Sequence, residues 1–107
     1  MGNDLLPGTL DMLILSSLTR GERHGYGIAQ HLKEISEDVL DVGESSLYPA
    51  LQRLLLNDWV TAEWRASQNN RRARYYKLTA AGRKQLAAEN REFDRMIVAI
   101  QKVMSCA

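Results

Sequence analysis

Residues 44 to 78 constrain the fold of this chain most, because a helical pattern passes directly into a strand pattern. The helical part places its apolar residues on one face: Leu47, Leu51, Leu54 and Leu55. From residue 60 the apolar spacing changes to two, at Val60, Ala62, Trp64 and Ala66. A polar turn over 67–71 contains Asn, which tolerates left-handed backbone conformations, and a second strand follows over 72–78. The pattern predicts a helix over 44–57 followed by a two-stranded ribbon.

The outer face of the predicted helix is polar, and its side chains lengthen along the helix. It carries Ser45, Ser46, Pro49, Gln52 and Arg53, with Tyr48 on the flank. We expect Ser45 or Ser46 to be the N-cap and Pro49 to lie in the first turn, where its missing N–H costs little. Short side chains at the start suit a major groove, and free N–H groups suit phosphate. An ordinary amphipathic helix explains this segment alone equally well.

Charge is distributed unevenly, although the whole chain has 14 Lys and Arg against 13 Asp and Glu. Residues 1–44 are acidic. Residues 53–84 contain Asp58 and Glu63 against a larger set of cations: Arg53, Arg65, Arg71, Arg72, Arg74, Lys77, Arg83 and Lys84. A charge run is usually a solvated face, but this one surrounds a polar hairpin tip and follows a helix of suitable shape. The combination favours binding to a polyanion, namely double-stranded nucleic acid.

The length of 107 residues indicates one domain with a modest core. The single cysteine, Cys106, excludes an internal disulfide and fits a reducing cytoplasm. No apolar run approaches the length of a membrane span, and Met1 to Leu6 lack the pattern of a secretory signal. We therefore expect a cytoplasmic protein that does not contact a membrane.

Two helices are expected before residue 44, over 9–18 and 25–36, with His24 to Gly27 opening the second. The short apolar segment Leu40 to Val42 is a candidate strand that could pair with the edge of the ribbon. Trp59 and Trp64 are expected to pack at the ribbon base.

The last predicted helix, 79–104 with Thr79 as its N-cap, would be about 39 Å long, too long for so small a body to cover. One face of it is apolar, and we expect the following residues to form a dimer interface: Leu86, Phe93, Met96, Ile97, Ile100 and Met104. The alternative is that the helix folds back onto its own core. Two-fold proteins match two DNA half-sites about one helical turn apart, so this helix would set their spacing.

Several motifs resemble the PadR family of bacterial transcriptional regulators over nearly the whole chain. They are Leu6-Pro7-Gly8-Thr9-Leu10, Ile14-Leu15, His24-Gly25-Tyr26-Gly27-Ile28, Ser46-Leu47-Tyr48-Pro49-Ala50-Leu51 with Arg53-Leu54, Arg74-Tyr75-Tyr76-Lys77-Leu78-Thr79, and Gly82-Arg83. The resemblance implies a mainly α fold with a small β-hairpin. It implies a winged helix-turn-helix domain over 1–78 and a C-terminal dimerisation helix over 79–107, which together form one compact unit.

The same resemblance implies promoter binding, usually as a repressor, with the helix over 44–57 as the recognition helix. The implied wing is the hairpin that contains Gln68, Asn69, Asn70, Arg71 and Arg72. Glu44-Ser45 departs from the small or glycine-containing start of many members, and the single C-terminal helix is typical of the short form. We expect phosphate contacts from Arg71, Arg72, Arg74 and Lys77, and base contacts from Ser46, Gln52 and Arg53. The expected partner is a palindromic operator bound by a homodimer.

The leading alternative is a winged-helix module that binds protein, since this fold hosts both uses. No enzyme, cofactor or metal is expected, because the sequence offers no nucleophile–base–orienter set. His24 and His31 lie on one helical face, but no further ligand completes a metal site, and a packing or capping role is expected for them.

A small aromatic effector could bind among Phe93, Met96, Trp59 and Trp64, which could equally be plain core residues.

Overall fold

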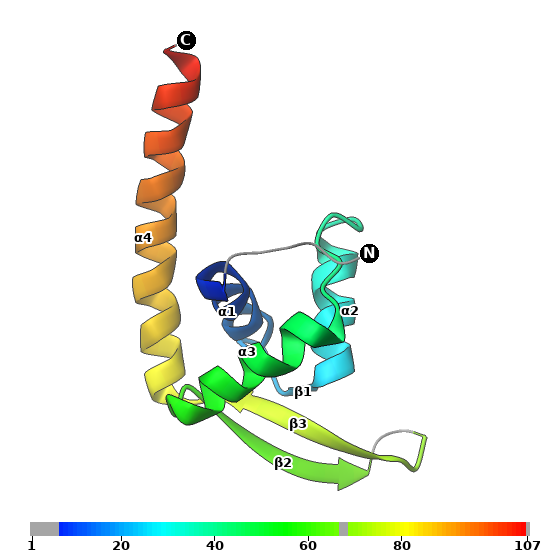
Figure 1. Ribbon diagram of the computed structural model, residues 1–107. Helices are drawn as coiled ribbons and strands as arrows, with labels where there is room; N and C mark the ends of the chain where they lie inside the picture. The colour runs from blue at the N-terminus through cyan, green and yellow to red at the C-terminus, as the bar shows by residue number, and fades with distance from the viewer. Residues whose placement is uncertain (1–6, 67–68, 107) are drawn as a thin grey trace.

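The computed structural model describes residues 7–66 and 69–106. Its elements follow the chain as α1 (Pro7–Ser17), β1 (Arg23–His24), α2 (Gly25–Ile35), α3 (Glu44–Leu56), β2 (Val60–Ala66), β3 (Arg72–Leu78) and α4 (Ala80–Ser105). The mainly helical class with a β-hairpin is therefore confirmed. Figure 1 shows three short helices gathered above the sheet, with α4 rising from one end of the sheet.

The core lies where α1, α2 and α3 meet the base of the ribbon. Its largest fully buried side chains are Ile14, Leu15, Leu18, Ile28, Leu47, Leu51, Leu54 and Val60. The apolar stripe predicted for 44–57 faces this core, and Leu55 lies at its edge, partly buried. Burial of such aliphatic side chains, at about 1.5–3 kcal/mol each, supplies most of the driving force that holds the helices on the sheet.

The sheet has three antiparallel strands in the order β1-β3-β2. Within the ribbon, Val60 pairs with Leu78 and Ala66 pairs with Arg72. The third strand is β1, where Arg23 pairs with Tyr76. The predicted strand at Leu40–Val42 is wrong, because this segment has no strand structure and Val42 is buried in the helical core instead.

The start of α3 also differs from the prediction. Gly43, not Ser45 or Ser46, is the N-cap, and the amides of Ser46 and Leu47 donate to its carbonyl. Because the helix begins at Glu44, Pro49 falls in the second turn, not the first. Its missing N–H leaves the carbonyl of Ser45 without the usual helical donor, on the exposed side of the helix.

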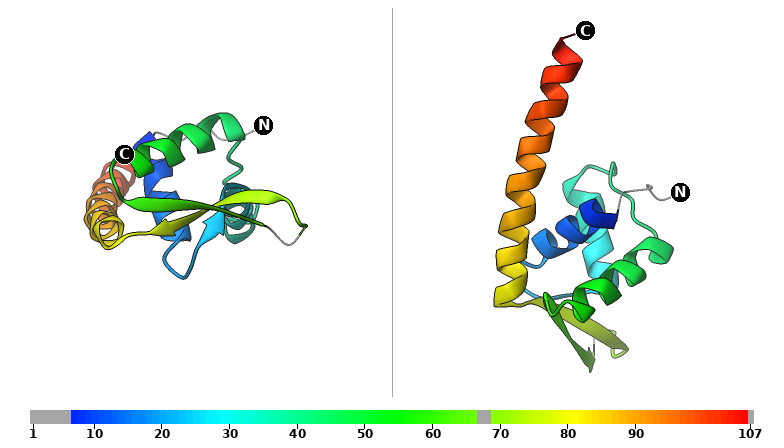
Figure 2. Two further views of the ribbon diagram at one scale, coloured as in Figure 1. Left: turned by 90° about the horizontal axis from the view of Figure 1, so that it is seen from below. Right: turned by 60° about the vertical axis from the view of Figure 1, so that its left-hand side comes forward.

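The long last helix begins as predicted. Thr79 is its N-cap, and the hydroxyl of Thr79 accepts from the amide of Gly82 at 2.9 Å. The amide of Thr79 donates to the carbonyl of Trp59 at 3.0 Å, which joins the start of α4 to the turn between α3 and β2. Leu86 still packs on the core, but the C-terminal half of α4 stands clear of the body in all views (Figures 1 and 2). In the described part of the chain, no helix has the length and hydropathy needed to cross a bilayer.

Candidate nucleic-acid interface

The ribbon of β2 and β3, hereafter the wing, passes from the core into solvent along one face. Tyr76 and Leu78 are buried at its base, while Trp64 is 56% exposed and Arg72 is exposed near its free end. The register places Trp64 opposite Arg74 and Ala66 opposite Arg72 on this face. Alternate residues of β3 therefore face one side of the sheet, where Tyr76 and Leu78 belong to the core and Arg72 and Arg74 continue toward the free end.

The cations of the wing differ in what they contact. Among the residues that the structure describes, none forms an ion pair with Arg71, Arg72, Arg74 or Lys77. Arg72 lies 6.0 Å from the ring centre of Trp64, and Arg74 lies 5.9 Å from that of Tyr76. The Nε of Arg74 is buried without a hydrogen-bond partner in the described chain. These four cations are available to an anionic partner.

Arg65, on the opposite face of the wing, belongs to an internal network. Its guanidinium pairs with Glu22 and lies 4.4 Å from the ring centre of Tyr75. The hydrogen bond to Glu22 raises the pKa of Arg65 above its ordinary value. The basic residues of the wing therefore divide into three groups: Arg65 is paired internally, Arg72 and Arg74 lie on the opposite face, and Lys77 shares the face of Arg65 nearer the ribbon base.

The tip of the wing is only partly described. Asn70 has φ 61°, a left-handed conformation that confirms the role expected of asparagine in the turn. Asn69 and Asn70 are exposed beside Arg71. Gln68, a predicted contact residue, lies outside the described residues.

The N-terminal half of α3 lies beside the wing. A cleft of about 360 Å³ between them is lined by Tyr26 and Tyr48 on the helical side and by Trp64, Arg72 and Arg74 on the wing. Ser45, Pro49 and Gln52 are exposed on α3, and Ser46 is half-buried. The left view of Figure 2 shows α3 passing over the sheet that continues into the wing.

The start of α2 holds α3 in this position. A Cβ built on Gly25 would lie 3.2 Å from Cε1 of Tyr48, so glycine lets the ring lie closer to the backbone than a side chain here would easily allow. His24 precedes it as the N-cap of α2, where Nδ1 accepts from the amide of Gly27 at 2.9 Å. The capping role expected of His24 is confirmed. In the described ranges, no three His, Cys, Asp or Glu side chains gather as a metal site would require.

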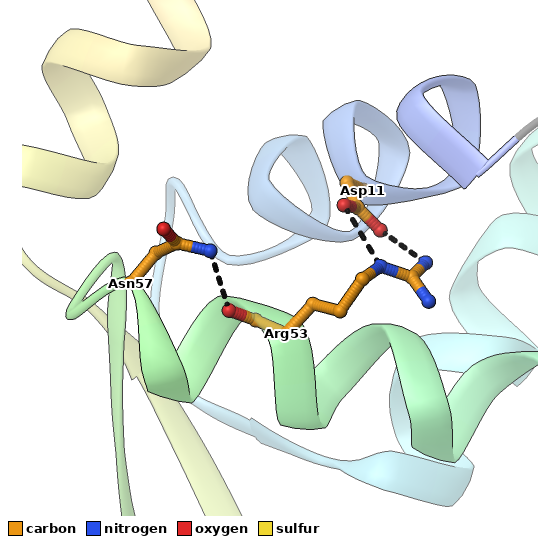
Figure 3. Close-up of polar contacts among 3 residues, drawn as sticks. All are labelled: Asp11, Arg53 and Asn57. Carbon is orange, nitrogen blue, oxygen red and sulfur yellow. Dashed lines mark hydrogen bonds and ion pairs between the residues drawn. The ribbon is translucent and has the colours of Figure 1, made fainter.

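Arg53, predicted to contact bases, is turned toward α1. Its Nη2 lies 2.8 Å from Oδ1 of Asp11, and its Nε lies 3.4 Å from Oδ2 (Figure 3). This hydrogen-bonded pair raises the pKa of Arg53 above its ordinary value. No local sequence pattern indicates this contact, because 42 residues separate the two partners.

The four residues considered for an aromatic effector are not brought together. Trp59 packs against the core, whereas the prediction that Trp64 also packs at the ribbon base is wrong, because Trp64 lies exposed on the wing. Phe93 and Met96 line a shallow apolar groove between α4 and α1. A single pocket formed by all four residues is therefore excluded by their positions.

The exposed apolar side chains of α4 form the remaining unusual surface. Phe93, Met96, Ile100 and Met104 are 40–73% exposed, and Ile97 is half-buried between them. Their spacing places them on one side of the helix. Leu86, the sixth residue predicted for the dimer interface, packs partly against the core of its own chain.

The helix-turn-helix of α2 and α3, together with the basic wing, defines a winged-helix transcriptional regulator. The chain belongs to the transcriptional regulator PadR-like family, whose model matches residues 14–88. The expectation drawn from the sequence motifs is confirmed.

Solved structures agree with this assignment. A transcriptional regulator from Clostridium thermocellum is 27% identical with a TM-score of 0.84, and the match covers 94% of this chain and 97% of that one. A PadR-like transcription factor from Bacteroides fragilis is 30% identical with a TM-score of 0.74, covering 91% of both chains. A PadR family regulator from Clostridium difficile is 27% identical with a TM-score of 0.76, covering 89% of this chain and 97% of that one.

Proposed function

We propose that this chain is a DNA-binding repressor that acts as a homodimer on a palindromic operator. The observation that carries the proposal is a set of wing cations that form no ion pair with any described residue, beside the exposed start of α3: Arg71, Arg72, Arg74 and Lys77. Regulators of this family bind DNA, and the proposal assigns that activity to named residues of this chain.

The recognition helix α3 enters the major groove with its N-terminal half. Ser45, Ser46 and Gln52 offer hydroxyl and amide groups at the depth of base edges, and Tyr48 and Pro49 present flat surfaces beside them. Glu44 is exposed in the first turn of α3 and is expected to point away from the phosphates, because like charges repel there.

The wing supplies affinity without sequence information. Its four cations contact phosphates, and Asn69 and Asn70 lie at the tip, where a sugar–phosphate backbone or minor groove would pass. Gln68, which lies outside the described residues, is proposed as a further contact from its place in the sequence. Each phosphate contact releases condensed counterions, so binding weakens as salt concentration rises. A protein-binding module does not need so many arginines without an ion pair among the described residues, so these cations favour DNA as the partner.

The dimer forms through α4. A helix whose apolar face stays exposed in a single chain gains stability by burying that face against a second copy. Two copies joined through Phe93, Met96, Ile97, Ile100 and Met104, with Leu86 at the edge, would present two recognition helices to successive turns of one duplex. A bound dimer that overlaps a promoter blocks polymerase access, which is repression by steric exclusion.

Gel-shift titration over a series of salt concentrations tests the proposal. The duplex is the sequence that the wild-type protein enriches from a randomised pool, and a scrambled duplex of equal composition serves as reference. We expect Arg72→Ala to weaken binding to both duplexes alike and to reduce the slope of log K against log salt by about 0.9, the contribution of one phosphate. Arg91→Ala, on the exposed side of α4, is the matched control. Unchanged affinity of Arg72→Ala for both duplexes would refute the assignment of the wing.

A further inference from the structure

The side chain of Arg53 leaves the outer face of α3 and reaches α1. Two of its nitrogens contact the carboxylate of Asp11, whose side chain is only 12% exposed, while that of Arg53 is 40% exposed. The carbonyl of Arg53 accepts from Nδ2 of Asn57 at 2.8 Å, so the last turn of α3 is held as well (Figure 3). Arg53 is thus fixed through its side chain and its backbone.

This geometry conflicts with a base-reading role. To reach a base edge, the guanidinium would have to leave Asp11, and a nearly buried carboxylate would remain without its cation. Removing one partner of such a pair is unfavourable because the other charge stays desolvated. The ion pair therefore favours the inward position of Arg53 when DNA is bound as well as when it is free.

Asp11 belongs to α1, the helix that also packs against α4. α1 lies between α3 and α4, with Asp11 on the side of α3. Other side chains of α1, Thr9, Met12 and Leu13, line a cleft of about 420 Å³ whose opposite wall contains Leu86 and Phe93 of α4. The helix that receives Arg53 is therefore the one that packs on the helix proposed to join two subunits.

We infer that Arg53 is a positioning residue, and that its pairing with Asp11 sets the orientation of the recognition helix relative to the α1–α4 unit. The inference rests on the proposed function and deepens it. In a dimer joined through α4, the two recognition helices must have a fixed separation and tilt to meet both half-sites together. The Asp11–Arg53 pair supplies a direct polar link between the reading element and the dimer-forming part of each subunit.

Operator discrimination in a double-mutant cycle tests the inference. Asp11→Asn, Arg53→Gln and the double variant are titrated against the enriched duplex and its scrambled reference. We expect each single variant to lower the ratio of the two affinities by about fivefold to tenfold, and the double variant to lower it no further, because all three lose the same contact. Arg53→Lys, which keeps the charge with a single donor group, should restore part of the discrimination.

Three outcomes would overturn the inference. Loss of discrimination in Arg53→Gln but not in Asp11→Asn would show that Arg53 reads a base directly. Additive losses in the double variant would show that the two side chains act separately. Equal weakening on both duplexes, with a matching fall in thermal stability, would show a purely structural pair. Failure of the proposed function itself appears differently, since the wild-type protein would then enrich no duplex.

Discussion

The ring of Tyr48 in α3 lies against the backbone of Gly25 in α2, so that a Cβ at position 25 would come within 3.2 Å of Cε1 and 3.4 Å of the hydroxyl oxygen. The two residues belong to the two motifs that most resemble the family, His-Gly-Tyr-Gly and Leu-Tyr-Pro-Ala-Leu. The structure therefore gives a physical reason for their joint occurrence, since the glycine creates the space in which the tyrosine stands beside the wing.

Gly25→Ala is expected to change DNA binding more than stability. Tyr48 is 47% exposed, and its ring can move by a few tenths of an ångström, so the fold should tolerate the new methyl group. Alanine also favours the helix by up to about 1 kcal/mol over glycine. The displaced ring should weaken operator binding by about 1 kcal/mol, the net contribution of one hydrogen bond. Thermal unfolding and gel shift measure the two effects, and a large fall in melting temperature would contradict the prediction.

Gly82→Ala, unlike Gly25→Ala, is expected to lower the stability of the fold. A Cβ on Gly82 would overlap the backbone carbonyl of Trp59 and lie 2.8 Å from Cδ1 of Leu78, and the backbone cannot yield as a tyrosine ring can. The variant should lose about 3 kcal/mol of unfolding free energy, the upper part of the usual overpacking range. Denaturant titration measures it. Gly8→Ala, where nothing lies within 4 Å of the new Cβ, is the control and should not lose stability.

Local periodicity predicted the helices and the ribbon, because each stripe faces a single core. It did not find β1, since two residues cannot show a period and Arg23–His24 become a strand only by pairing with Tyr76 and Tyr75. The same short length made Leu40–Val42 look like a strand, although tertiary packing draws Val42 into the core. Elements defined by long-range pairing leave no local signal in the sequence.

For the candidate site, the sequence predicted the position of the wing but not which of its cations form internal ion pairs. The period-two spacing from Val60 to Ala66, followed by a polar turn and a basic second strand, located the wing and its cations. Whether a cation forms an internal ion pair depends on carboxylates that are distant in the sequence. Arg53 pairs with Asp11 of α1, and Arg65 pairs with Glu22. The amino-acid composition does not distinguish cations that form internal ion pairs from those that remain able to bind DNA. That distinction requires the fold.

Trp64 should report DNA binding by its fluorescence. It is one of two tryptophans, is 56% exposed, and lies on the same wing face as Arg72, which the proposal places at a phosphate. In Trp59→Phe, where Trp64 is the remaining tryptophan, we expect emission to be quenched and shifted to shorter wavelength as duplex is added, because the ring loses water. In Trp64→Phe the remaining signal from Trp59 should change little. The reverse pattern would place the DNA at the ribbon base.

Ile100→Asp should separate the subunits of the proposed dimer. Ile100 is 49% exposed on the apolar side of α4, and a charge there would be desolvated on association. Val98 is 50% exposed and lies on the opposite side of the helix by its spacing, so Val98→Asp introduces the same charge at equal exposure as a matched control.

Sedimentation velocity should show a dimer for the wild type and Val98→Asp, and a monomer for Ile100→Asp at the same concentration. The monomeric variant should retain the affinity of one recognition helix for a half-site but lose the added affinity that two linked heads gain on a full palindrome, a factor of about 100 or more. Dissociation of Val98→Asp with an intact Ile100→Asp dimer would place the interface on the other face of α4. If the wild-type protein were a monomer that bound its duplex at full strength, the proposal that α4 sets the spacing of two recognition helices would be refuted.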